Sequence, residues 1–303
     1  MGSAAEVHVV GGADGLVALA RRRVEDLEAR WSRFLPTSEV SRLNASAAMP
    51  VRVSPETYEL IERALDAWRM TDGRFDPTVL GDVLRAGYVT SFEHLPTAGR
   101  TPTSGLGRGA EHIELDAATA SVCLPAGVGF DPGGIGKGLA ADLVVAELLA
   151  LGADGACVNL GGDVRVAGDA PDGSWVVAVE HPWRPGPIAR VYLRDGGVAT
   201  SSRARRRWVT STGAAHHLID PTRGEPADVA VLTASAVAAT GWQAEAFAKA
   251  AFLAGLPDGL DLLDRAQVGG VLVDDDGAVL TNRALWSFTD GAPAPRTSTE
   301  VTT

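Results

Sequence analysis

Residues 131–142 are DPGGIGKGLAAD, a segment in which an extended stretch ends, a glycine-rich turn follows and a helix begins. Such a turn presents backbone N–H groups and the positive end of a helix dipole, which together suit a pyrophosphate. The segment is not a P-loop, because Asp131 stands where that motif has its first glycine, and Gly138 follows Lys137 in place of Ser or Thr. It does not match the dinucleotide fingerprint G-x-G-x-x-G either. A phosphate-binding turn and a purely structural turn both remain open at this point.

The segments around this turn predict an α+β fold with mixed, largely antiparallel sheets packed with helices. Strands and helices are interspersed, but they lack the regular alternation of a doubly wound parallel sheet. We expect strands at 6–10, at 111–124, 156–167, 174–180 and 188–199, and in a hairpin over 270–280. We expect helices at 16–31, 54–73, 135–151 and 235–254. Residues 291–303 have the composition of a disordered tail.

The charge balance argues against a nucleic-acid partner. The chain of 303 residues carries 27 basic and 38 acidic side chains, a formal charge of −11, whereas binding to phosphate backbones needs a basic face. No apolar run approaches the roughly 20 residues that cross a bilayer, so we expect no membrane insertion. The N-terminal residues do not resemble a secretion signal, and the two cysteines have no metal-ligand spacing. We therefore expect a cytoplasmic protein with free thiols.

Lysine is almost absent from this chain. Lys137 and Lys249 are the only two lysines, and arginine supplies every other basic side chain. Because an ammonium and a guanidinium differ in shape and hydration, both lysines are candidates for a functional role. Biased codon usage is the alternative explanation.

Four further segments carry residues of interest. Gly161 and Gly162 interrupt a predicted strand, which indicates a bulge or the close approach of another group. His217 lies at a predicted turn and is a candidate acid or base, although most such histidines only satisfy local hydrogen bonds. The arginine-rich segment 201–208 favours a solvated loop over a phosphate clamp. Glu245 and Lys249 lie four residues apart on one face of an otherwise apolar helix, so they form either an ordinary surface pair or part of a site.

Taken in order, these motifs resemble the ApbE family, the FAD:protein FMN transferases. The resemblance extends from residue 1 to about residue 280 and is carried by RFLPTSEVSRLN, DGRFDPTV, DPGGIGKGLAAD, NLGGDVRVAG, VATSS, HLIDPTRGEP and AEAFAKAAF. It implies one domain over residues 1–290, FAD bound across the motifs, and Mg²⁺ near the pyrophosphate. It also implies transfer of the FMN half of FAD to a Thr or Ser hydroxyl of a target protein, in a segment like D-x-x-S/T-G-A/S, with release of AMP.

The resemblance assigns expected roles to individual residues. The residues implied to bind FAD are Met1, Phe34 in place of a flavin-stacking Tyr, Arg74, Phe75, Asp76, Asp131, Lys137 and Ile219. Beside these implied residues, our own candidates for catalysis are His217 as the general base, Asp220 and Lys249. Gly134 corresponds to a position that offers a metal ligand.

The sequence departs from the family at its metal pair. Glu245 and Lys249 occupy the positions of a ligating Asp and, four residues later, a ligating Thr. An ammonium cannot ligate Mg²⁺, so the departure puts magnesium dependence in question. We hypothesise that Glu245 holds the Lys249 ammonium at the position of the family's metal ion. There the ammonium would offset the negative charge of the pyrophosphate.

Two other functions remain open from the sequence. The same scaffold with water as the acceptor would be an FAD pyrophosphatase that yields FMN and AMP. A catalytically weak FAD-binding accessory protein is the second alternative, because the metal pair is altered.

Overall fold

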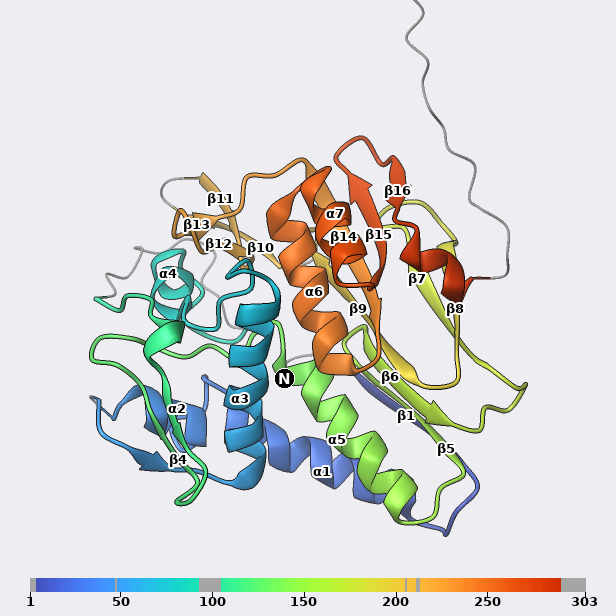
Figure 1. Ribbon diagram of the computed structural model, residues 1–303, viewed down its shortest axis with the longest axis horizontal. Helices are drawn as coiled ribbons and strands as arrows, with labels where there is room; N and C mark the ends of the chain where they lie inside the picture. Colours follow the sequence, from blue (N-terminus) through green and yellow to red (C-terminus); the bar gives the residue numbers. More distant parts are fainter. Residues whose placement is uncertain (1–3, 47, 93–104, 205, 211–212, 290–303) are drawn as a thin grey trace, which may run out of the picture.

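An antiparallel sheet forms the centre of the protein (Figure 1), as described by a computed structural model over residues 4–46, 48–92, 105–204, 206–210 and 213–289. Within these ranges, seven strands pair in the order β1-β5-β6-β9-β14-β15-β16, and every neighbouring pair is antiparallel. The strands are β1 (Ala5–Val10), β5 (Gly155–Leu160), β6 (Asp163–Gly168), β9 (Gly196–Ser202), β14 (Val231–Ala238), β15 (Gly269–Asp274) and β16 (Val279–Thr281). The predicted α+β class is confirmed. The expected tail, 291–303, lies outside the described residues.

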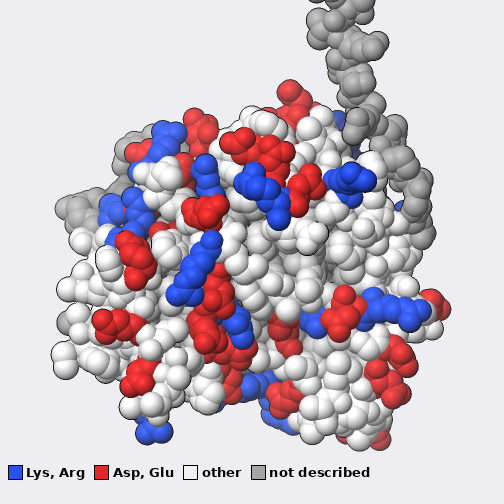
Figure 2. All heavy atoms as spheres, in the orientation of Figure 1, with Lys and Arg blue, Asp and Glu red and all other residues white. Residues whose placement is uncertain are grey.

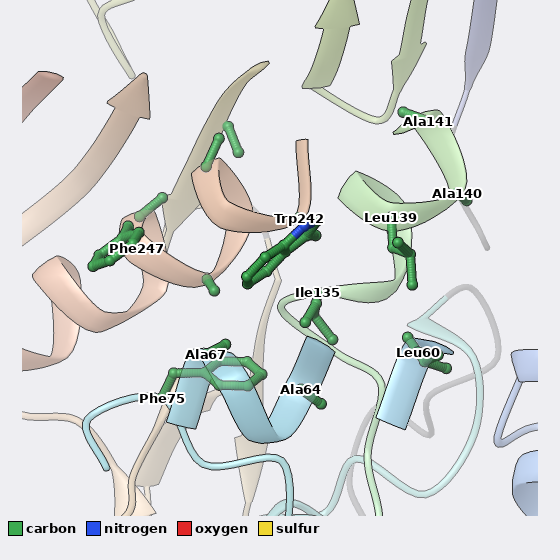
Figure 3. Close-up of a cluster of buried hydrophobic side chains, with 14 of the residues drawn as sticks. Leu60, Ala64, Ala67, Phe75, Ile135, Leu139, Ala140, Ala141, Trp242 and Phe247 are labelled. Carbon is green, nitrogen blue, oxygen red and sulfur yellow. The ribbon is translucent and has the colours of Figure 1, made fainter. Parts of the chain in front are cut away.

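Five of the helices lie on one side of this sheet. They are α1 (Leu16–Trp31), α3 (Pro55–Met70), α5 (Gly136–Ala150), α6 (Gly241–Ala254) and α7 (Asp258–Arg265). α5 packs on β5 and β6, α6 packs on β9 and β14, and α3 contacts α1 and α6. Trp242 of α6 lies among Ile135, Leu139, Ala67 and Phe75, so apolar side chains from α3, α5 and α6 meet in one cluster (Figure 3).

The opposite face of the sheet is covered by the hairpin of β7 (Trp175–Glu180) and β8 (Pro187–Leu193) and by the 3₁₀ helix η3 (Ala284–Phe288). Along β14, Ala234 and Ala236 belong to the cluster beneath the helices, whereas Val237 belongs to the cluster beneath this hairpin. Because successive side chains of a strand point to opposite faces of the sheet, β14 is buried on both of its faces.

Short elements complete the described chain. They are α2 (Glu39–Asn44), β2 (Val51–Arg52), α4 (Leu80–Arg85), the 3₁₀ helix η2 (Ala110–His112), β3 (Glu114–Asp116), β4 (Ser121–Cys123), β10 (Arg207–Thr210), β11 (Gly213–His216), β12 (Ile219–Asp220) and β13 (Glu225–Pro226). In the described part, no helix is both long and apolar enough to cross a bilayer. Acidic and basic side chains are interspersed on the face that Figure 2 shows.

The helix predicted over 235–254 is wrong in its first turn. Residues 235–238 belong to β14, which pairs with β9 on one side and β15 on the other, and α6 begins only at Gly241. Alanine favours helix, but all eight residues of β14 are buried in the middle of the sheet. Tertiary packing therefore overrides the local preference.

The strand predicted over 156–167 is two strands. Gly161 and Gly162 form the two-residue turn of a hairpin between β5 and β6, with φ of 68° and 100°. Positive φ at both central residues is the condition for a type I′ turn, which glycine meets without strain. The predicted bulge is therefore a hairpin turn, and the strand predicted over 188–199 likewise divides between β8 and β9.

The glycine-rich segment also holds two helices together. A Cβ atom at Gly138 would lie 2.3 Å from the backbone oxygen of Gly241, and one at Gly241 would lie 2.6 Å from the oxygen of Gly138. Asp142 then accepts hydrogen bonds from the N–H groups of Gly241 and Trp242 at 2.8 and 2.9 Å. Glycine stands at position 138 because the start of α6 lies against it.

We expect Gly138→Ala to destabilise the protein by about 1–3 kcal/mol, because a backbone-to-backbone clash must be relieved by moving a helix. The measurement is urea denaturation. Gly136→Ala is the matched control, since a Cβ there meets only Pro132 at an ordinary 3.5 Å. Equal stability of the two variants would contradict this account.

Candidate active site

A cavity of about 650 Å³ opens beside the first turn of α5, which is within the size range of small-molecule sites. Seven residues singled out from the sequence line it: Phe34, Asp131, Gly134, Lys137, His217, Glu245 and Lys249. They come from segments more than 200 residues apart, brought together by the packing of α5 and α6 on the sheet. The cavity therefore brings these seven residues together, but Arg74, Phe75, Asp76, Ile219 and Asp220 do not line it.

The glycine-rich turn is fixed by hydrogen bonds at its first residue. The Asp131 N–H donates to the Pro77 oxygen at 2.8 Å, and the Asp131 carboxylate accepts from the Gly133 N–H at 2.9 Å. The Arg33 guanidinium lies 3.7 Å from the same carboxylate. Asp131 thus orders the turn and joins it to the segment before α2.

Lys137 is held by two buried carboxylates. Its ammonium pairs with Asp163, and it lies 3.4 Å from Glu245 Oε1. The other oxygen of Glu245 accepts a hydrogen bond from the Gly138 N–H at 2.8 Å. Asp163 and Glu245 are at most 5% exposed, so leaving either carboxylate without these partners would be costly.

Lys249 points into the turn. Its Nζ donates to the Gly133 oxygen at 2.6 Å and lies 5.7 Å from the centre of the Phe75 ring. Burial lowers the pKa of Lys249, although the charges of Asp131 and Glu245 oppose that shift. The expected direct pair between Glu245 and Lys249 does not form, because Glu245 turns to Lys137 and the Gly138 N–H while Lys249 reaches Gly133.

His217 contributes a neutral imidazole to the cavity. Burial, with the positive charges of Arg206 and Lys249, holds the pKa of His217 well below its usual 6.5. Its Nδ1 is buried and has no hydrogen-bond partner in the described part of the chain. A neutral ring with an unpartnered nitrogen is able to accept a proton.

The low pKa of His217 predicts a pH dependence of stability. Between the folded pKa and 6.5 the unfolded chain binds more protons, so the free energy of unfolding rises with pH. Stability present above pH 6.5 is therefore lost as pH falls below it, by up to about 1.4 kcal/mol per pH unit for one such group. We expect His217→Gln to flatten this slope in denaturation series between about pH 5 and 8. His112→Gln, at a surface position, is the control and should leave the slope unchanged; equal slopes for His217→Gln and the wild type would refute the expectation.

Some expected site residues lie off the cavity. Asp220 instead closes the turn after β12, where its carboxylate accepts from the N–H and hydroxyl of Thr222 at 2.8 and 2.7 Å. The Ile219 side chain packs with the apolar cluster around Val79 and Tyr88. The structure thus gives the side chains of Asp220 and Ile219 local structural roles.

The DGRFDPTV segment packs beside the site without lining the cavity. Phe75 is fully buried against Lys249, and Asp76 accepts hydrogen bonds from the Thr78 N–H and hydroxyl at 2.7 and 2.6 Å. Arg74, Phe75 and Asp76 are not among the residues that line the cavity. Met1 lies outside the described residues.

The cavity includes residues that the sequence did not single out for the site. The Arg33 guanidinium lies 4.1 Å from the Phe34 ring centre and 4.7 Å from that of Tyr88, and it donates to the backbone oxygen of Tyr88 at 2.9 Å. Arg206, from a segment expected to be a solvated loop, also lines the cavity, as does Asp163. Arg33 begins the quoted motif RFLPTSEVSRLN and Asp163 lies in NLGGDVRVAG, so membership of a motif was an available signal for both.

Comparisons with known proteins agree on one family. The sequence model of the ApbE family matches residues 1–272. An FAD:protein FMN transferase of Rhodobacter capsulatus is 30% identical in an alignment of 282 residues that covers 89% of this chain and 53% of that protein. The corresponding transferase of Vibrio cholerae is 27% identical over 84% of this chain and 79% of its own length. The chain thus spans about half of the first relative and about four fifths of the second.

Solved structures show the same fold. The crystal structure of an ApbE protein from Thermotoga maritima has a TM-score of 0.82 and 28% identity, over 94% of this chain and 96% of that one. Flavinyl transferase ApbE of Pseudomonas stutzeri has a TM-score of 0.80 and 23% identity, over 97% and 95% of the two chains.

Proposed function

The chain belongs to the ApbE family, and on that premise we propose that it transfers the FMN moiety of FAD to a Thr or Ser hydroxyl of a target protein and releases AMP. The observation that carries the proposal is the meeting of Lys137, Lys249 and a neutral His217 in one cavity at a glycine-rich turn. The curated relatives that the chain matches are named FAD:protein FMN transferases.

The pyrophosphate of FAD fits the end of the cavity formed by the turn and the first residues of α5. Two ammonium groups and the N-terminal end of a 15-residue helix favour an anion there. The flavin fits the other end, where Phe34 and Tyr88 offer aromatic surface. Ile219 and Asp220 follow His217 by two and three residues, and their side chains lie off the cavity.

The transfer proceeds by attack of the acceptor hydroxyl on the FMN phosphorus. The hydroxyl oxygen forms a bond to that phosphorus, and the bond to the bridging oxygen breaks. AMP leaves with the bridging oxygen and the electron pair, while the hydroxyl proton passes to His217. Lys137 and Lys249 stabilise the negative charge that spreads over the phosphoryl oxygens.

Product analysis tests this function. We expect AMP to form in step with covalent attachment of flavin when the protein is incubated with FAD and a domain carrying a D-x-x-S/T-G-A/S segment, and little AMP to form without that domain. Equal amounts of free FMN and AMP without an acceptor would identify an FAD pyrophosphatase. Bound FAD that stays intact under both conditions would identify an accessory protein.

We propose further that residues 1–290 act as one domain in the cytoplasm. One apolar cluster includes residues from Leu16 to Leu272, which supports a single folding unit. Cys123 and Cys157 are both free thiols, and burial raises the pKa of Cys157 to about 11. Cell fractionation that recovers most of the protein outside the cytoplasm would overturn the assignment of the compartment.

A further inference from the structure

The residues present do not fit the divalent cation that the family resemblance implies. Among the described residues, no three His, Cys, Asp or Glu side chains come together in a way that would hold a metal ion. Glu245, at the position of a ligating Asp, already engages Lys137 and the Gly138 N–H with its two oxygens. Mg²⁺ needs a near-octahedral set of oxygen ligands, and here a lysine stands where one of them is expected.

The Lys249 ammonium itself occupies the position beside the turn. Its Nζ lies 2.6 Å from the Gly133 oxygen, a carbonyl that is otherwise suited to a cation. A Cβ atom at Gly134 would lie 2.7 Å from Lys249 Cδ and 2.8 Å from its Nζ. Gly134, with φ of 100°, leaves the space that the lysine fills, so the turn and the lysine are complementary in shape.

The surrounding charges favour a cation at this point. Asp131, Glu245 and Asp76 act on the Lys249 ammonium with negative charge, and Lys137 acts on it with positive charge. Lys249 is 7% exposed, so its interactions are weakly screened by water. A pyrophosphate at the turn would add negative charge on the remaining open side and favour the charged form of the lysine.

We propose that the Lys249 ammonium replaces the divalent cation, so that this chain binds FAD without a metal ion. The proposal rests on the proposed function, because it takes the pyrophosphate of FAD to lie at this turn. It assigns Lys249 to binding the substrate pyrophosphate, and it assigns Glu245 to holding Lys137 and the start of α5.

Calorimetric titration with FAD, in EDTA and then in Mg²⁺, tests the proposal. The wild type should bind FAD with the same Kd, within about twofold, under both conditions. Lys249→Met, which removes the charge and offers no ligand, should bind FAD at least about tenfold more weakly under both. The double variant Glu245→Asp/Lys249→Thr, which places the family's metal pair in this cavity, should bind weakly in EDTA and recover in Mg²⁺.

A second readout does not involve FAD. Mg²⁺ should raise the Tm of the double variant but leave the Tm of the wild type and of Lys249→Met unchanged. If the double variant does not fold, the wild type and Lys249→Met still decide the question. Wild-type binding that is lost in EDTA and restored by Mg²⁺ would overturn the replacement while leaving the proposed function standing. A wild type that binds no FAD under either condition would overturn both.

Discussion

Replacing His217 by alanine is expected to lower the rate of FMN transfer by about 100- to 10,000-fold, the usual contribution of a positioned general base. FAD should bind with nearly its wild-type affinity, because the pyrophosphate is assigned to the lysines and the flavin to Phe34 and Tyr88. The imidazole is placed for this role because His217 lines the cavity and its Nδ1 has no hydrogen-bond partner in the described structure.

Single-turnover transfer and FAD titration, measured side by side, separate these two effects. His112→Ala is a control, since His112 is exposed and its ring lies 3.7 Å from the carboxylate of the neighbouring Glu111. A His217→Ala protein that transfers FMN at the wild-type rate would remove the histidine from the mechanism. A parallel loss of FAD binding would show instead that His217 acts in binding.

Replacing Lys137 by methionine is expected to weaken FAD binding by about 10- to 150-fold. A charge-assisted hydrogen bond to a phosphate contributes about 1.5–3 kcal/mol. The change also strips Asp163 of its ion partner and Glu245 of a nearby positive charge, both in buried positions. Removing one partner of a buried ion pair costs about 3–5 kcal/mol of stability. The effect of the substitution on stability must therefore be measured separately from its effect on FAD binding.

The double variant Lys137→Met/Asp163→Asn separates the effect on stability from the effect on FAD binding. It removes both charges of the pair, so it should be more stable than Lys137→Met while binding FAD equally weakly. Denaturation and calorimetry on the same preparations measure the two quantities. Wild-type FAD affinity in either folded variant would exclude Lys137 from the pyrophosphate site.

The sequence located the cavity through local chemistry. The scarcity of lysine marked Lys137 and Lys249, which lie 112 positions apart in the chain and both line the cavity. The DPGGIGKG turn was recognisable because glycine and a helix start leave a local signature. A turn motif of this kind can be recognised in the sequence because it depends on a few consecutive residues.

Contacts between distant segments were not predictable in the same way. Helical spacing indicated a pair of Glu245 with Lys249, yet Glu245 meets Lys137 and Lys249 meets Gly133, because the packing of α5 against α6 offers each a nearer partner. The alanine-rich start of the 235–254 segment is a strand for a similar reason, since its neighbours β9 and β15 are supplied by other parts of the chain. Tyr88, in no motif, reaches the cavity only through tertiary packing.

The mass of an acceptor domain after incubation with this protein and FAD is the most direct test of the proposed transfer. The acceptor should carry a D-x-x-S/T-G-A/S segment, with a Thr→Val version of the same domain as the control. We expect the acceptor to gain one FMN moiety, joined through its phosphate to the Thr hydroxyl, with one AMP released for each FMN attached. The Val version should remain unmodified. An unmodified Thr acceptor in the presence of bound FAD, whether the FAD stays intact or is split into FMN and AMP, would contradict the account.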